Sequence, residues 1–111
     1  MVTDDTPRGA LPLVDLASVT ADTFAPCLGQ AFTVEGTAAA LSLTLAAVDA
    51  LPQTPGPGRP EPFALVFRGP AHPMRAQGIC TLEHPGLGRL DLFLVPVAPD
   101  AQGARYEAVF S

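Results

Sequence analysis

Apolar and polar residues alternate along most of the chain after residue 30. In QAFTVE (30–35), Phe32 and Val34 alternate with polar residues, and the leucines that open LSLTLAAVDAL (41–51) are separated by Ser42 and Thr44. A period of two is typical of a β-strand that buries one face. Similar runs predict four further strands, at residues 63–68, 79–84, 89–97 and 105–110.

Connections rich in glycine and proline separate these strands. PGLG (85–88) is typical of a tight turn, in which Gly86 or Gly88 supplies a positive φ. GTAAA (36–40) predicts a hairpin turn, and PQTPGPGRPEP (52–62), with five prolines and two glycines, predicts an extended loop. We therefore expect an all-β fold, a small six-stranded antiparallel barrel or sandwich, and the pattern does not choose between the two.

The residues before the first strand lack this alternation. We interpret residues 1–18 as a loose N-terminal arm and residues 19–111 as a single β domain. One short N-terminal helix is predicted within SVTADTFAPCLGQ (18–30), with Thr20 as its N-cap. Phe24, Cys27 and Leu28 then share one face, and Pro26 limits the helix to about two turns.

Charge and composition exclude several classes of function. The net charge is −5, 48% of the residues are apolar, and all six basic residues are arginine. An acidic chain without a basic patch is not suited to nucleic acid or to an anionic membrane surface. No apolar run approaches the ~20 residues of a membrane helix, so we expect no membrane insertion. Asp4 and Asp5 stand where a secretory signal carries positive charge, which indicates a cytoplasmic protein or one exported without a Sec-type signal peptide.

The alternation also predicts which side chains form the core. Two sets of residues are expected to be buried, one from the leucine-rich strands and one of aromatic residues at alternating positions. The first set is Leu43, Leu45, Leu65, Phe67, Leu92, Leu94 and Tyr106, and the aromatic set is Phe32, Phe63, Phe67, Phe93, Tyr106 and Phe110. Since the strand at 89–97 is apolar on both faces, the pattern leaves its inward set open. Cys27 and Cys80 are far apart without metal-ligand spacing, and we expect two buried free thiols rather than a disulfide.

Three polar residues at the ends of predicted strands are candidates for a site. Arg68 ends one strand, and Glu83 and His84 end the next. The first interpretation is structural: Arg68 ties two loops together through Glu83 or Glu107, and His84 bonds a turn carbonyl beside Pro85. The second is that Arg68 anchors a ligand. Glu83 and His84 point to opposite faces by the alternation, which argues against a metal site.

No motif for catalysis or cofactor binding is present. G-x-S-x-G is absent, neither cysteine has a base beside it, and no glycine-rich phosphate-binding loop occurs. We expect no enzymatic activity, no catalytic residues, no cofactor and no metal.

The strand at residues 89–97 is apolar on both faces. Leu90, Leu92 and Leu94 lie on one face and Phe93, Val95 and Val97 on the other, and a strand of this kind is normally covered on both sides. The arm supplies the remaining apolar material, with Leu11, Leu13, Val14 and Leu16. It can fold back on its own domain or cross to a neighbouring copy, and we favour slightly the second, in which the arm contributes to self-association.

The order of several motifs resembles a known family. F-x-L-x-F-R-G-P (63–70), L-E-H-P-x-L-G (82–88), L-F-L-V-P-V (92–97) and Y-E-A-V-F (106–110) are similar to a small bacterial all-β domain family of unknown function. The resemblance covers about residues 16–111. It implies a free-standing β domain with no assigned activity or catalytic residues, in a family sometimes associated with phage-tail-collar-like proteins.

Together these observations favour a non-enzymatic structural or interaction module. Its expected partner is protein, either a homo-oligomer or a surface or fibre-like assembly to which it is an accessory. The alternative is a small β-barrel that binds an apolar ligand in its interior.

Overall fold

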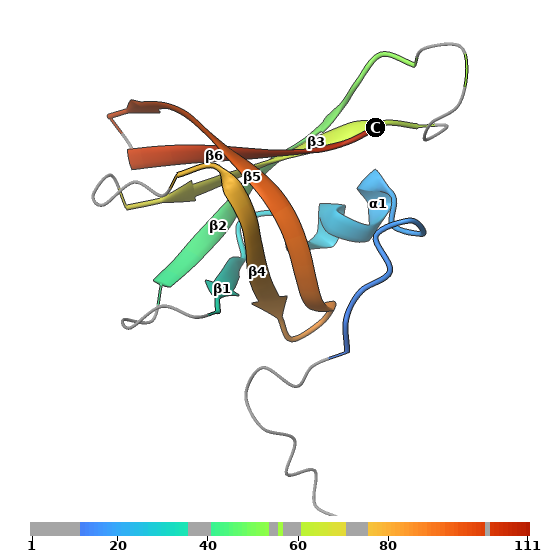
Figure 1. Cartoon of the computed structure of the whole chain (residues 1–111), viewed down its shortest axis with the longest axis horizontal. Coiled ribbons are helices and arrows are strands. Elements are labelled where there is room, and N and C mark those ends of the chain that lie inside the picture. The colour runs from blue at the N-terminus through green and yellow to red at the C-terminus, as the bar shows by residue number, and fades with distance from the viewer. Residues whose placement is uncertain (1–11, 36–40, 54–55, 57–60, 71–75, 102) are drawn as a thin grey trace, which may run out of the picture.

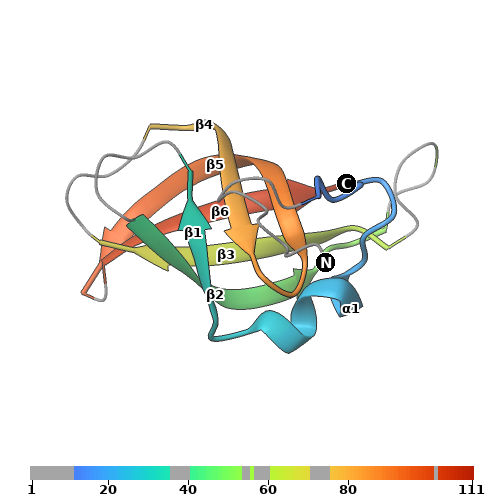
Figure 2. The same cartoon turned by 90° about the horizontal axis from the view of Figure 1, so that it is seen from below.

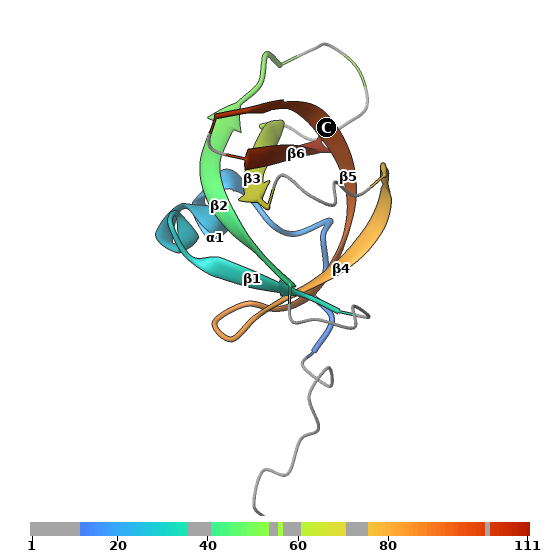
Figure 3. The same ribbon diagram turned by 90° about the vertical axis from the view of Figure 1, so that its left-hand side faces the viewer.

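Six antiparallel strands form a closed barrel. The computed structural model describes residues 12–35, 41–53, 56, 61–70, 76–101 and 103–111. Around the barrel the strands follow the order β1–β2–β3–β6–β5–β4, and β4 closes onto β1 (Figures 1 and 3). The strands are β1 (Ala31–Val34), β2 (Leu41–Ala50), β3 (Phe63–Gly69), β4 (Gly78–His84), β5 (Gly88–Asp100) and β6 (Gly103–Phe110).

All six predicted strands are confirmed, and the open choice between barrel and sandwich is decided for the barrel. The predicted turn at residues 36–40 and most of the proline-rich loop lie outside the described residues. Among the described residues, register shifts occur in two strand pairs: between Val97 and Asp100 in the pairing of β5 with β6, and between Leu45 and Ala47 in the pairing of β2 with β3. Such a bulge inserts an extra residue, so that Leu45 lies opposite Phe67 and Val48 opposite Leu65.

Aromatic side chains fill the barrel. The Phe32 and Phe67 rings meet edge to face with centroids 5.3 Å apart, and Phe63 stacks on Phe110 at 4.6 Å. These geometries suit aromatic rings and add to the free energy gained by their burial. The seven residues of the predicted leucine-rich set are buried, as are the aromatic residues named with them, except Phe93. The prediction for Phe93 was wrong, because this side chain points out of the barrel and half of it is exposed.

A short helix closes one side of the barrel. α1 (Ala21–Phe24) continues into a 3₁₀ turn, η1 (Ala25–Cys27), and the Phe24 ring reaches Phe63 at 6.0 Å and Phe110 at 5.7 Å. Thr20 is the N-cap, as predicted. Leu28, predicted to share the buried face, is exposed, because the chain leaves the helical conformation at this residue. Figures 2 and 3 place α1 on the β2 side of the molecule.

Both cysteines are free and buried, as expected. Burial raises the pKa of the Cys27 thiol, because a thiolate loses its hydration in an apolar surrounding. The charged form is therefore better tolerated by the unfolded chain, and the contribution of this thiol to folding stability falls as the pH rises above its ordinary pKa.

The first prediction concerns the core. Phe67→Ala removes a ring that contacts Phe32 and should lower the free energy of unfolding by about 3–5 kcal/mol. Phe93→Ala is the matched control, and its cost should stay within about 1 kcal/mol because the ring is half exposed. Urea denaturation measures both. Equal losses for the two variants would contradict the assignment of inward and outward faces.

The second prediction concerns Cys27. In a Cys80→Ala variant, iodoacetamide at pH 8 should alkylate the folded protein at least about tenfold more slowly than the urea-unfolded protein, because the thiolate is the nucleophile and both its population and its access are reduced. Mass spectrometry follows the reaction. Equal rates in the two states would show that this thiol is not buried in solution.

Candidate functional site

His84 is the last residue of β4, its side chain is buried, and two hydrogen bonds hold its ring. Its Nε2 lies 2.6 Å from Oε1 of Gln30, and the Gly86 N–H donates to its Nδ1 at 3.0 Å. Since an amide oxygen only accepts, Nε2 carries the proton. The expected bond to a turn carbonyl was wrong: the ring accepts from a turn N–H instead. His84 also packs on Phe32, at 4.8 Å between centroids, and so joins the β4–β5 turn to the segment before β1.

Arg68 and Glu83 lie on strands that are not neighbours in the barrel. Arg68, on β3, lies opposite Thr44 and Arg105. Glu83, on β4, lies opposite Thr33 and Arg89. Arg68 therefore does not share a pairing partner with Glu83, and Glu83 and His84 point to opposite faces as expected. The three candidates are separate features of the barrel.

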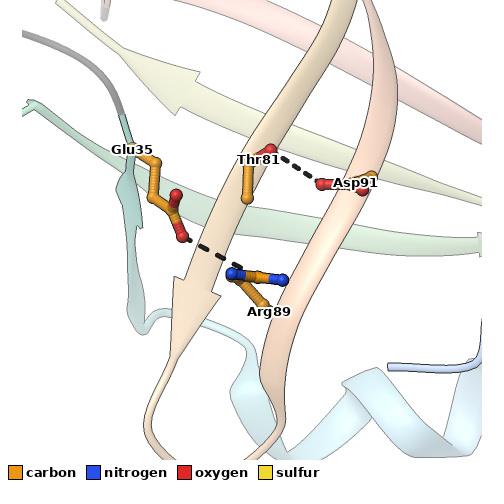
Figure 4. Close-up of polar contacts among 4 residues, drawn as sticks. All are labelled: Glu35, Thr81, Arg89 and Asp91. Carbon is orange, nitrogen blue, oxygen red and sulfur yellow. Dashed lines mark hydrogen bonds and ion pairs between the residues drawn. The ribbon is translucent and has the colours of Figure 1, made fainter. Parts of the chain in front are cut away.

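A polar cluster occupies the outer face where β4 and β5 meet their turn. Thr81 Oγ1 donates to Asp91 at 2.7 Å, and Arg89 Nε lies 4.0 Å from Glu35 Oε2, a distance within the range of an ion pair but too long for a hydrogen bond (Figure 4). Glu83 lies opposite Arg89 in the next strand. With three carboxylates and one guanidinium, this acidic end of the outer face carries a net negative charge.

The other end of the same outer face carries positive charge. Arg105 on β6 lies between Val97 on β5 and Arg68 on β3, so two arginines face each other across neighbouring strands. Like charges in directly opposite positions disfavour one another. Glu107 lies two residues further along β6 and offsets part of the charge. We refer to Arg68 and Arg105 as the arginine end.

Between the two ends lies an exposed apolar surface. Ile79 lies opposite Phe93 in the β4–β5 ladder. Val95 on β5 and Val109 on β6 lie on the same outer side, and Glu107 lies opposite Val95. The exposed fractions of these four side chains, which we call the apolar face, are 66% (Ile79), 50% (Phe93), 39% (Val95) and 55% (Val109). Apolar residues that are exposed together, rather than singly, mark interaction surfaces in soluble proteins.

The sequence contained a signal for this face. The strand at 89–97 is apolar on both sides, which indicated a need for cover, but every aromatic residue was assigned to the core. The structure shows that Leu90, Leu92 and Leu94 take the inner positions and that Phe93 is left outside.

A hollow of about 230 Å³ adjoins the apolar face where β5 and β6 diverge. β5 pairs with β4 as far as Leu94, and its pairing with β6 runs from Val95. The N–H and C=O of Arg89 bond to the arm and therefore point away from β4. Since backbone direction repeats at every second residue of a strand, the N–H and C=O groups of Asp91 and Phe93 also point away from β4, toward the hollow. The residues that line it are Leu16, Asp91, Leu92, Phe93, Ala108, Val109, Phe110 and Ser111.

The arm lies along its own domain, at the end of the hollow nearest Arg89. The Val14 N–H donates to the Arg89 carbonyl and the Arg89 N–H donates to the Pro12 carbonyl, both at 2.8 Å, so Leu13 forms a parallel bridge with β5. Val14 and Leu16 pack against the core, whereas Leu13 remains 57% exposed. Within a single chain the arm thus takes the folded-back position, one of the two alternatives. Leu11 lies outside the described residues.

The first residue of β5 leaves no room for a side chain where the arm passes. Gly88 has φ +121°, and a Cβ at this position would lie 2.5 Å from the Pro12 carbonyl oxygen. Of the two glycines considered for a positive φ, Gly88 is therefore the one that supplies it.

The described residues contain no cluster for a metal and no membrane-spanning helix. Histidine, cysteine, aspartate and glutamate do not come together in groups of three or more that could hold an ion anywhere in the part of the chain that the structure describes. Nor does any described helix have the length and hydropathy required to cross a membrane.

The fold and surface define a small closed β-barrel with a divided outer face. A comparison with protein-family profiles matches residues 19–110 to the domain of unknown function DUF6916, and the chain belongs to this family. Searches of curated proteins and of solved structures found no match.

The third prediction concerns the contact between the arm and Gly88. Gly88→Ala forces a side chain into a positive-φ conformation and against the Pro12 carbonyl, and should lower the free energy of unfolding by about 1–3 kcal/mol. Gly86→Ala, in the same turn, is the control and should cost less, because a Cβ there meets only the His84 ring, at 3.3 Å. Hydrogen exchange at the Val14 amide should accelerate in Gly88→Ala alone. An unchanged Val14 amide in that variant would contradict docking of the arm.

Proposed function

We propose that this protein is a non-enzymatic interaction module that binds a protein surface through its apolar face. The observation that carries the proposal is the side-by-side exposure of Ile79, Phe93, Val95 and Val109 on three adjacent strands. Burial of such side chains is favourable by roughly 25 cal/mol per Å², which gives a partner a reason to bind there. Charged residues stand at the two ends of this surface, and Glu107, opposite Val95, lies at its β6 side; interfaces likewise combine an apolar centre with a polar rim.

The shape of the surface favours a protein partner. The four side chains belong to the convex outside of a barrel, whereas small-molecule sites are concave and enclose most of their ligand. The barrel interior, the other place for a small apolar ligand, is occupied by the rings of Phe24, Phe32, Phe63, Phe67 and Phe110. These contacts support the module rather than the ligand-binding barrel.

The hollow beside the apolar face supports the same proposal. Asp91 and Phe93 direct backbone groups toward it, and an extended segment of a partner could pair there as an added strand. Its volume of about 230 Å³ is below the roughly 300–1,000 Å³ typical of small-ligand sites. An accessory role in a surface or fibre-like assembly is the biological setting that we propose, because a small domain with an apolar flank is suited to packing between other chains.

The fourth prediction tests whether the apolar face binds protein. A photo-crosslinking phenylalanine analogue at position 79, in cells that naturally make the protein, should yield an adduct heavier than the single chain. The matched control places the analogue at Ser42, which is exposed on the outer side of β2. Mass spectrometry identifies the captured chain. Absence of an adduct at position 79 beyond that at position 42 would refute the proposal.

The same preparation tests the ligand-binding alternative. Native mass spectrometry of the purified protein should show the mass of the chain or its multiples. A reproducible additional mass of lipid size, lost in Leu65→Ala but retained in Ile79→Ser, would favour an interior ligand instead.

A further inference from the structure

We infer that the partner of the apolar face is a second copy of this chain. The two copies are related by a two-fold axis that lies between them and runs across β5 at the level of Leu94. This inference rests on the proposed function and names its partner. It combines three observations: the apolar residues at the centre of the face, the opposite charges at its two ends, and the equal spacing of both along β5.

The apolar centre is complementary to itself under this symmetry. Phe93 and Val95 flank Leu94 on the outer side of β5, and both are exposed. A two-fold axis at Leu94 brings Phe93 of one copy onto Val95 of the other, and the same contact is repeated in reverse. Ile79 and Val109, on the strands at either side, widen the apolar contact around the axis.

The charged ends select the antiparallel orientation. Asp91 and Val97 are equally far from Leu94 along β5, and Arg105 lies opposite Val97 on β6. The two-fold axis therefore brings Asp91 of one copy to the level of Arg105 of the other, with Glu35 and Glu83 behind Asp91 and Arg68 behind Arg105. A parallel arrangement would place carboxylates on carboxylates and arginines on arginines, which costs free energy.

The size of the surface requires these ends to take part. A standard interface buries about 800 Å² on each partner, more than four partly exposed side chains provide, since even a large aromatic residue offers only about 150–250 Å². A second copy that covers only the apolar centre would be held weakly. Contact that extends to the acidic and arginine ends enlarges the buried area and adds attraction that salt weakens.

A two-fold contact closes on itself, so this face produces a dimer rather than a filament. A larger assembly would need a second surface. The arm is the other candidate, because its Leu13, which bridges to Arg89 of β5, is exposed.

The fifth prediction is that the chain forms a dimer through the apolar centre of this face. Analytical ultracentrifugation of the full-length protein at low ionic strength should show a monomer–dimer equilibrium. Phe93→Glu should raise the dissociation constant at least about 30-fold, because it places a charge at the centre of the contact twice in each dimer. Leu13→Glu, an exposed leucine of the arm, is the matched control and should leave the constant within about threefold. The reverse result would assign dimerisation to the arm and overturn the inference.

The charged ends allow a sharper test by mixing variants. Asp91→Arg and Arg105→Glu should each weaken the homodimer by about 3–10-fold, because each places like charges together at both ends of the contact. In a heterodimer of the two variants, the introduced arginine faces the introduced glutamate at one end, and the native Asp91 and Arg105 meet at the other. Native mass spectrometry of an equimolar mixture should therefore show more heterodimer than the statistical fraction of about one half.

Three outcomes would overturn the inference. The protein could remain a monomer up to millimolar concentration, the two variants could mix only statistically, or the dimer could tolerate Phe93→Glu. Thermal unfolding of each variant separates loss of association from loss of folding. If the position-79 crosslink captures a different protein while the purified chain stays monomeric, the interaction module stands and the self-docking fails.

Discussion

The exchange of neighbours along β5 governs the outer surface of this barrel. The strand pairs with β4 in its first half and with β6 in its second, so it passes from one side of the ring to the other. Its inner leucines, Leu90, Leu92 and Leu94, enter the core, while no second layer formed by the described part of the chain covers Phe93 and Val95 on its outer side. α1 packs on Phe63 and Phe110 and lies on the β2 side, so it does not cover this part of β5 (Figure 2). Phe93 and Val95 are left on the outside for this reason.

The same exchange opens the hollow and limits its extent. Backbone groups of β5 between Arg89 and Val95 face a gap, because β6 has diverged from them. An open strand edge invites uncontrolled pairing, and proteins keep such edges short. Here the arm closes one end through Arg89 and β6 closes the other at Val95. The close passage of Pro12 over Gly88 is part of that closure. What remains is a short segment beside an apolar surface, an arrangement suited to a specific contact.

The inner and outer faces of the barrel differ in how their side chains are arranged. Inside, a narrow six-stranded ring leaves room for rings that contact one another, and the polar atoms of His84 are satisfied by Gln30 and Gly86. Outside, acidic residues gather where β4 turns into β5, and arginines gather where β3 meets β6. The chain as a whole is acidic, so the arginine end is a local departure from its charge. Such a separation of charge around an apolar centre gives a docking surface a direction.

The sequence determined the six strands, the short helix and most of the core, because alternation and turn residues act over a few neighbouring positions. It also indicated that β5 needs cover on two sides. Closure of the ring, the passage of β5 from β4 to β6 and the position of the arm depend on contacts between residues far apart in the chain, which local pattern does not encode. Arg68 and Glu83 looked like neighbours because their strands follow one another in sequence, yet the barrel places them on non-adjacent strands. Phe93 looked like core because aromatic residues in strands are usually buried. Only the tertiary structure decided which face of β5 the barrel encloses, since that choice is made by register with both neighbouring strands at once.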